Sequence, residues 1–470
     1  MAATNTKTTK SHVYAEERLA GGYGTRAAKQ PDEMALRRLV MTCLLWEDVA
    51  YASGTTVADQ IKALVPKVAP ATVNSIAIEA RTQQKLRHVP LLLAREMARH
   101  EAYKPFVANL LAEVIRRPDE LAEFVAIYRK TNDGKKSLSA QVKRGLAKAF
   151  EKFDEYQLAK YAKKSKEFSL RDVLFLCHAK PKDEAQAALW KRLVEDQLAT
   201  PDTWEVGLSA ATTDDEKRFV WERLISAGKL PAFAFLKNLR NMKDVGVPLR
   251  TVVNGMDALK PDMLLPIDFI RAAAAAPDWR LELERLMFRC CAEFPKLAGS
   301  TVFVVDVSGS MAQRMSAKTD FNRINAAAAM ATLAAEMCEH IAIYVTAGSD
   351  SARMHKTEKL KPTRGFALAD TIAESYNRMG GGGIFTRQCL EYIRGQEKED
   401  PDRIIVFSDS QDCDYPDKRK PAPFGKHNYI VDVSSHQHGI NYEGVWTAEI
   451  AGWSEHFLRF IAACETNAMN

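Results

Sequence analysis

The chain has 470 residues, of which 46% are hydrophobic and 27% charged, a balance that is typical of globular domains and argues against extensive disorder. This length allows roughly two to four domains, and no apolar run is long enough to span a membrane. The net charge of +6 is unevenly distributed, since residues 1–300 carry 48 Lys and Arg against 38 Asp and Glu, and residues 301–470 carry 18 against 22. Such a basic excess is the usual footprint of a nucleic-acid partner, although proteins that bind none also show it.

Residues 1–31 are polar and glycine-containing, and we expect them to form a flexible arm. They lack the apolar core of a signal peptide, so a cytoplasmic protein is expected. The eight cysteines show neither CxxC pairs nor metal-finger spacing, which favours reduced thiols.

From residue 32 onward, apolar residues recur three and four positions apart in short segments that Pro, Gly or polar turns separate. The predicted helices are 34–51, 57–65, 71–83, 89–100, 106–115, 121–129, 140–153, 170–178, 184–198, 214–227, 232–242 and 281–294. No strand pattern interrupts this series. We therefore interpret residues 32–295 as an irregular α-solenoid of HEAT-like helical hairpins, which offers a concave surface or, if it closes on itself, a ring.

After Gly299 the pattern changes to strands that alternate with helices, which is typical of a doubly wound, Rossmann-like parallel sheet. This predicts a second domain at 296–470. The predicted strands are 301–305, 341–346, 403–408 and 429–433, and the predicted helices are 322–339, 367–378, 386–394 and 454–463.

A polar loop follows the first of these strands and carries Asp306, Ser308 and Ser310 at alternate positions. Parallel sheets hold their ligand sites at the carboxyl ends of the strands, and hard ions such as Mg²⁺ or Mn²⁺ prefer oxygen ligands. Thr386, which follows a run of four glycines, and Asp409, at the end of another apolar strand, complete a candidate site for a divalent cation. The alternative is that the two serines cap the next helix and that Asp409 is an ordinary loop carboxylate.

These five residues, in this order, resemble the metal-ion-dependent adhesion site of von Willebrand factor A domains. The resemblance implies that the first three side chains and the threonine supply oxygens directly or through water, and that the last carboxylate acts through water. In that family the threonine directly follows the glycines, whereas Ile384 and Phe385 intervene before Thr386 in this chain.

Two stretches of the helical part, 169–181 and 221–242, resemble the TROVE module of the Ro ribonucleoprotein family, and Thr203-Trp204-Glu205 fits upstream of the second. In that family a ring of helical repeats precedes an A-type domain, which is the order predicted here. The resemblance implies a monomeric, noncatalytic RNA-binding protein of RNA quality control. Structured Y-type RNA would bind the outer basic surface, and single-stranded 3′ ends of misfolded RNA would enter the ring, with an exoribonuclease or another protein as a further partner.

The first stretch implies outer-surface RNA contacts at Lys160, Lys164 and His178. Residues 160–166 contain four lysines and a tyrosine; clustered cations neutralise phosphates, and an aromatic ring can stack on an unpaired base. The alternatives are a solvated basic helix end for the lysines and a core or capping role for His178. Further basic residues between 129 and 148 would widen this surface.

A different class of function also fits the sequence. The chain would then be a protein-interaction adaptor that holds an acidic partner residue on the metal of its A-type domain, with no RNA role. A metal-dependent hydrolase is disfavoured, because the residues offer a single ion position with no paired metal and no histidine base beside it.

Overall fold

A computed structural model of the chain describes residues 32–42, 54–83, 86–130, 137–162, 167–259, 264, 266–292, 296–314, 322–379, 381–409, 412–414, 422–433, 446–451, 457–458, 461–462 and 464–465. The predicted N-terminal arm and Lys164 lie outside these residues, as does most of the predicted helix 454–463. Among the described helices, none is both long enough and apolar enough to cross a membrane.

The amphipathic segments predicted between residues 57 and 198 form helices close to their expected bounds, and the predicted helix 34–51 is described only as far as Thr42. Their apolar faces share one core, which runs from Leu36 to Leu193. The short helix α9 was not predicted, because its seven residues are too few to show an apolar repeat. The helices are α2 (Asp32–Thr42), α3 (Gly54–Leu64), α4 (Pro70–Thr82), α5 (Val89–Met97), α6 (Lys104–Val114), α7 (Pro118–Arg129), α8 (Ala140–Phe150), α9 (Glu155–Tyr161), α10 (Leu170–Cys177) and α11 (Glu184–Val194).

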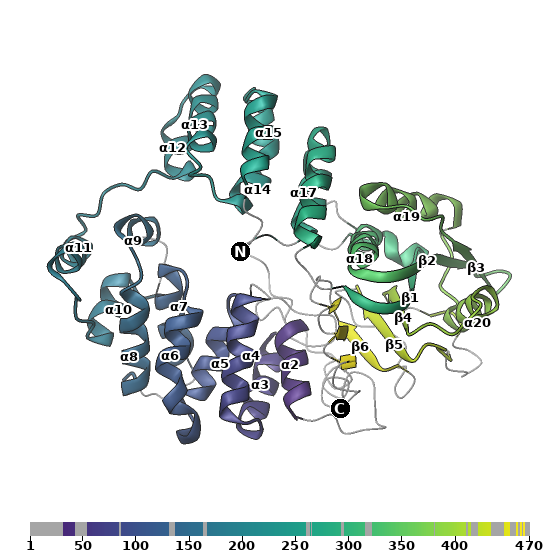
Figure 1. Cartoon of the computed structure of the whole chain (residues 1–470), viewed down its shortest axis with the longest axis horizontal. Helices are drawn as coiled ribbons and strands as arrows, with labels where there is room; N and C mark the ends of the chain where they lie inside the picture. The colour runs from purple at the N-terminus through teal and green to yellow at the C-terminus, as the bar shows by residue number, and fades with distance from the viewer. Residues whose placement is uncertain are drawn as a thin grey trace.

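An extended segment, residues 195–203, connects α11 to the second group of helices (Figure 1). Ion pairs hold its far end, where the Asp202 carboxylate contacts the Arg223 guanidinium at 2.7 Å and the Lys229 ammonium at 2.9 Å. Sequence reasoning missed three helices of the second group, α12, α15 and α16. The group comprises α12 (Trp204–Ala210), α13 (Asp214–Ser226), α14 (Ala232–Asp244), α15 (Leu249–Ala258), α16 (Pro266–Ala275) and α17 (Arg280–Ala292).

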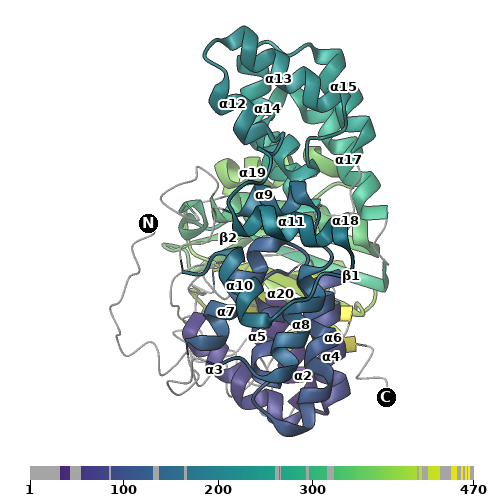
Figure 2. The ribbon, with the colours of Figure 1, turned by 90° about the vertical axis from the view of Figure 1, so that its left-hand side faces the viewer.

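The helices follow an arc from α2 through α8 and α11 to α17, and the α/β domain lies beyond α17 (Figure 1). Seen from the side, α12 to α15 lie at one end of the molecule and α2 to α8 at the other (Figure 2). The core of α13 to α17 is continuous with one face of the sheet, so these helices and the α/β domain pack as neighbours. At this junction Glu284 on α17 accepts a hydrogen bond from the backbone N–H of Phe366 at 2.6 Å.

The C-terminal domain contains a six-stranded sheet with the order β3-β2-β1-β4-β5-β6. The predicted parallel arrangement holds for five of these strands, but β3 runs antiparallel to β2 at the edge. Neither β3 nor β6 was predicted. The elements are β1 (Leu297–Asp306), α18 (Arg323–Met337), β2 (Cys338–Ser349), β3 (Met354–Lys359), α19 (Gly365–Met379), α20 (Thr386–Gln396), β4 (Arg403–Ser408), β5 (His427–Asp432) and β6 (Ala448–Ala451).

Strand β1 is buried on both faces, as its uninterrupted apolar run predicts. Phe303 and Val305 point into the core that α18 and α19 cover, whereas Val302 and Val304 point into the core that α20 covers. Because β1 and β4 are neighbours at the centre of the sheet, the residues that follow them meet at its carboxyl edge.

Candidate metal site and nucleic-acid surface

Asp306 and Asp409 lie close together at the carboxyl edge of the sheet. Asp306 is the last residue of β1, Asp409 directly follows Ser408 at the end of β4, and both carboxylates are fully buried. The Ser408 hydroxyl donates a hydrogen bond to Asp306 Oδ2 at 2.6 Å. The pairing of two central parallel strands thus brings together two acids that are about a hundred residues apart in the chain.

The turn after β1 adds two hydroxyls to this site. The Ser308 backbone N–H donates to Asp306 Oδ1 at 2.8 Å, and the Ser308 and Ser310 hydroxyl oxygens are 3.3 Å apart. Neither hydroxyl caps the following long helix, since α18 is capped by Asn322, whose side chain accepts from the Asn325 backbone N–H at 2.8 Å. Ser308 is the N-cap residue of the short 3-10 helix Gly309–Ala312, but its side chain makes no capping hydrogen bond there. The capping alternative for the two serine hydroxyls is therefore wrong at both helices.

Thr386 is the first residue of α20, and a glycine-containing loop that precedes it borders the same edge. This loop contacts the Ser308–Ser310 turn through the hydrogen bond from Gly309 N–H to the Gly382 carbonyl, at 3.0 Å. The two residues that separate Thr386 from the glycines are buried: Ile384 bridges to Asp412, and the Phe385 ring packs against Gly348, where a Cβ would come within 2.3 Å of it. Ile384 and Phe385 therefore point into the interior of the domain, and the glycine-containing loop keeps its contact with the Ser308–Ser310 turn.

Arg323 is a member of this site that sequence reasoning missed. It is the first residue of α18, it is 1% exposed, and its Nη1 lies 2.6 Å from Asp409 Oδ2. The same nitrogen donates to the Ser310 carbonyl at 3.3 Å. The one sequence signal is a charged residue at the start of an otherwise alanine-rich, buried helix.

The two buried carboxylates, Asp306 and Asp409, would be stabilised by additional positive charge in the site. Burial raises the pKa of Asp306 to about 7, and the nearby charge of Asp409 adds to the shift. Asp409 Oδ1 is buried and accepts no hydrogen bond from the part of the chain that the structure describes. An oxygen without a partner, beside a second carboxylate and two hydroxyls, is a donor set that suits a hard divalent cation.

No cluster of three or more His, Cys, Asp or Glu side chains in the described ranges could hold a metal ion. The Asp306 site does not depend on such a cluster, because two carboxylates and the serine hydroxyls would provide its oxygens.

The second candidate site is the surface around α9 and α10. Lys160 on α9 is half-buried, with its ammonium 5.9 Å from the centre of the Tyr161 ring. The guanidinium of Arg117 lies over the same ring at 4.9 Å, and Asp119 holds this guanidinium through hydrogen bonds of 2.7 and 3.0 Å. Tyr161 is thus flanked by two cations.

His178 is exposed and ends α10 in the left-handed conformation, with φ 53° and ψ 42°. Its backbone N–H donates to the Phe175 carbonyl at 3.3 Å. The core alternative for His178 is therefore wrong, whereas the capping alternative describes its backbone and leaves the imidazole free to serve another purpose.

Two exposed neighbours of His178 escaped sequence reasoning. Phe175 is 56% exposed, and the Arg171 guanidinium lies 5.9 Å from its ring centre. Arg171 and Phe175 are spaced i and i+4, so they lie on one face of α10, and His178 is the left-handed residue that caps the end of this helix. We call these three residues the α10 stripe. The spacing is visible in the sequence, but the exposure of Phe175 is not.

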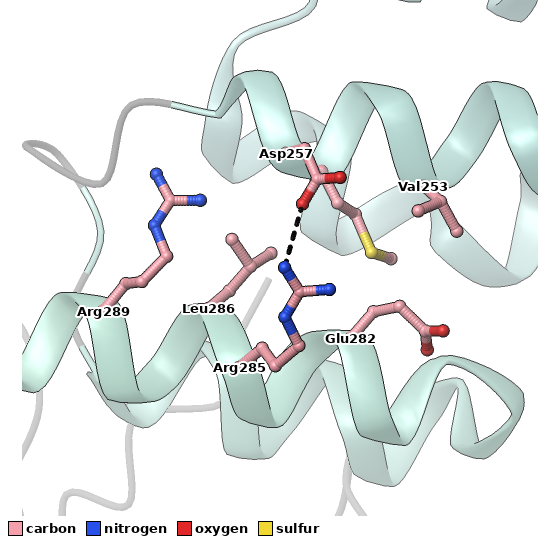
Figure 3. Close-up of a pocket in the computed structure, with 7 residues that line it drawn as sticks. Val253, Asp257, Glu282, Arg285, Leu286 and Arg289 are labelled. Atoms are coloured by element: carbon pink, nitrogen blue, oxygen red, sulfur yellow. Dashed lines mark ion pairs between the residues drawn. The ribbon is translucent and has the colours of Figure 1, made fainter.

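Two cavities among the described residues of the helical part lie apart from both sites. A crevice between α15 and α17 has a free volume of about 10 Å³, which is room for one water molecule. Figure 3 shows Arg285 pointing at Asp257 across it, at 3.7 Å, with Arg289 alongside. An open hollow of about 470 Å³ lies on α12 and α13, beside the exposed Phe219.

Comparison with known proteins assigns the chain to a family. The model of the TROVE domain matches residues 40–197 and 191–368, which together are more than half of the chain. The chain belongs to the TROVE family. Telomerase protein component 1 of Mus musculus is 24% identical to this TROVE protein over an alignment of 305 residues, and the match covers 47% of this chain and 12% of the mouse protein. The Rattus norvegicus protein of the same name is 22% identical over an alignment of 303 residues, and the match covers 46% of this chain and 11% of the rat protein.

This TROVE protein thus matches only a small part of the length of these relatives. Its fold is similar to the crystal structure of the Ro (RSR) protein of Deinococcus radiodurans, with a TM-score of 0.63 and 18% identity. The similarity covers 92% of this chain and 99% of that chain, so helical repeats followed by an α/β domain describe both proteins.

Proposed function

We propose that this TROVE protein is a noncatalytic RNA-binding protein that serves as the scaffold of a small ribonucleoprotein. The observation that carries the proposal is the α10 stripe, in which a cation and an exposed aromatic ring share one helix face and an exposed histidine caps the end of the helix. An arginine neutralises phosphate, and stacking on an aromatic side chain is worth about 1–3 kcal/mol per base. The basic excess of residues 1–300 supports the same function.

Within this function, α9 and the α10 stripe would form the outer surface for structured, Y-type RNA, with Lys160, Lys164 and His178 among its contacts. The arc of helices would close into a ring that admits single-stranded 3′ ends of misfolded RNA. The protein would act as a monomer in cytoplasmic RNA quality control, alongside an exoribonuclease or another protein.

Gel-shift titration at several salt concentrations, with a stem-loop RNA and a single-stranded RNA, tests this proposal. Each lysine on a phosphate releases about one counterion, so replacing Lys160 and Lys164 with alanine should lower the salt slope of log affinity by roughly two. Phe175→Ala should weaken binding about tenfold without changing the slope, because stacking releases few counterions.

The matched control is Phe219→Ala. Phe219 is 66% exposed on α13, but the acidic Asp215 and Glu216 lie beside it, so its loss should leave RNA affinity unchanged. The proposal fails if the lysine variant and Phe175→Ala both bind stem-loop RNA as the wild type does near physiological salt. The proposed outer surface for structured RNA is also refuted if these variants weaken binding of the single-stranded RNA but not of the stem-loop RNA.

We also propose that the α/β domain resembles von Willebrand factor A domains in function as well as sequence motif, and binds Mg²⁺ or Mn²⁺. Asp306, Ser308, Ser310 and Asp409 would hold the ion, with Thr386 as a further ligand. When bound, the ion would offer an open position to an acidic side chain of a partner. Asp306→Ala should abolish divalent binding in isothermal titration, because mainly neutral hydroxyls would remain, and should leave RNA affinity unchanged.

The Asp306 site also supports the second candidate function, a protein-interaction adaptor without an RNA role. Salt-dependent RNA binding that involves several phosphates would exclude this adaptor, whereas metal binding without any RNA affinity would favour it. We assign no reaction to the site, because two carboxylates around one ion position do not form a paired-metal centre.

A further inference from the structure

The Asp306 site contains a permanent cation of its own. Arg323 and Asp409 are both buried, and the Arg323 guanidinium is 2.6 Å from Asp409 Oδ2. A buried carboxylate that lacked this partner would be strongly destabilising. Arg323 therefore supplies part of the charge that a metal ion would otherwise supply.

The contact leaves the site incomplete. Arg323 takes one oxygen of Asp409, while the other oxygen, Oδ1, is buried and accepts no hydrogen bond from the described residues. Asp306 is bonded to Ser308 and Ser408, which are neutral donors. The site thus contains two buried carboxylates and one guanidinium, which contacts Asp409, so the site keeps room for positive charge but holds less net negative charge than two free carboxylates.

A second buried arginine of the same domain is bonded more completely. At the opposite edge of the sheet, Arg403 is 3% exposed and donates to both oxygens of Glu465, at 2.9 and 2.6 Å, and to the Thr301 hydroxyl at 2.9 Å. Arg403 leaves no oxygen of Glu465 without a donor. This pair is a purely structural reference against which Arg323 can be compared.

We infer that Arg323 is an internal cation of the Asp306 site, which keeps the α/β domain folded without a metal and lowers the affinity of the site for divalent ions. The inference rests on the proposal that the site binds Mg²⁺ or Mn²⁺. A bound divalent ion and the guanidinium repel each other because both lie against Asp409, and repulsion between charges is strong in a buried site. Arg323 thus sets the metal concentration at which the site fills.

The test uses the full-length chain with Mn²⁺ and Mg²⁺ as probes, in isothermal titration and in thermal melts with and without EDTA. Arg323→Met should lower the Kd for Mn²⁺ by about tenfold or more, because it removes a like charge from a buried site. It should also lower the melting temperature in EDTA and enlarge the gain in melting temperature that Mn²⁺ produces.

Arg403→Met is the matched control, since it removes a buried arginine of the same domain far from the site. It should lower the melting temperature and leave the Kd for Mn²⁺ unchanged. The double variant with Arg323→Met and Asp409→Asn removes the ion pair as a unit, so it should melt above Arg323→Met in EDTA and lose the gain in affinity.

The outcomes separate the two proposals. If the wild type and Arg323→Met bind Mn²⁺ with the same Kd, the role of Arg323 is overturned and metal binding stands. If neither binds any divalent ion although both are folded, metal binding and the competition with Arg323 are both overturned.

Discussion

Glu120 lies at the centre of a buried charge network that joins α4 to α7. Its carboxylate is fully buried and accepts hydrogen bonds from Arg81 Nη2 at 2.7 and 2.9 Å. One of its oxygens also accepts from the backbone N–H groups of Arg116 and Arg117, at 2.8 and 3.1 Å. The carboxylate thus holds both the Arg81 side chain and the start of α7. Arg117, whose guanidinium lies over the Tyr161 ring, directly precedes this helix.

Glu120→Gln keeps the shape of this side chain and a carbonyl acceptor, but it removes the negative charge. The Arg81 side chain is 6% exposed, so the change leaves a buried cation without its counter-ion. Breaking a buried pair in this way costs about 3–5 kcal/mol, and we expect about 3 kcal/mol because glutamine still accepts from the backbone.

Arg81→Met should cost less, about 2 kcal/mol, because Glu120 keeps its backbone donors and the nearby Arg87. The Arg87 Nε lies 3.3 Å from Glu120 Oε1. In the double variant the two losses should not add, and the interaction energy should be at least about 1 kcal/mol.

Urea unfolding followed by circular dichroism measures these differences, and hydrogen exchange of the α4 and α7 amides locates them. Asp400→Asn is the control, because Asp400 pairs with Arg394 at 3.2 Å on the surface and should change stability by less than about 0.5 kcal/mol. A Glu120→Gln variant within about 1 kcal/mol of the wild type would refute the reasoning, as would additive single changes.

Three further predictions concern single residues. Burial beside Arg87 lowers the pKa of His88 to about 4, so between about pH 4 and 6.5 the unfolded chain binds more protons than the folded chain. The free energy of unfolding should therefore fall by roughly 1–2 kcal/mol on acidification through that window, since the side chain is 30% exposed. Urea titrations at pH 7 and pH 5 measure this fall, which should be smaller in His88→Gln. His178→Gly should raise the free energy of unfolding by about 1 kcal/mol, because glycine adopts the left-handed conformation without strain, yet should weaken stem-loop RNA; unchanged RNA affinity would leave His178 only its capping role. Gly145→Ala should destabilise by about 1–3 kcal/mol, because its Cβ would come within 2.9 Å of Leu111, whereas Gly395→Ala, with open space around it, should not.

The Asp306 site shows which contacts can be predicted from local sequence patterns and which cannot. Asp306 and Asp409 were predictable as neighbours, because each ends an apolar strand and the ends of parallel strands share an edge. Arg323 was not predictable, since its contact with Asp409 joins residues 86 positions apart and depends on how α18 packs on the sheet. The exposure of side chains was equally unpredictable: the i, i+4 spacing of Arg171 and Phe175 is present in the sequence, but only packing of the opposite face of α10 leaves Phe175 outside the core.

The sequence by itself determined that a helical part precedes an α/β domain. A helix with one buried face shows apolar residues every three or four positions, and a strand that is buried on both faces shows a continuous apolar run. Strand β3 left no such repeat, since it lies at the sheet edge with one face exposed and the other only half-buried, and it forms because it pairs with β2. The seven-residue helices α9 and α12 are likewise too short to carry a period and depend on capping and on their neighbours. Tertiary structure alone decided these elements and the ion pair at Asp409, because their stabilising contacts come from distant parts of the chain.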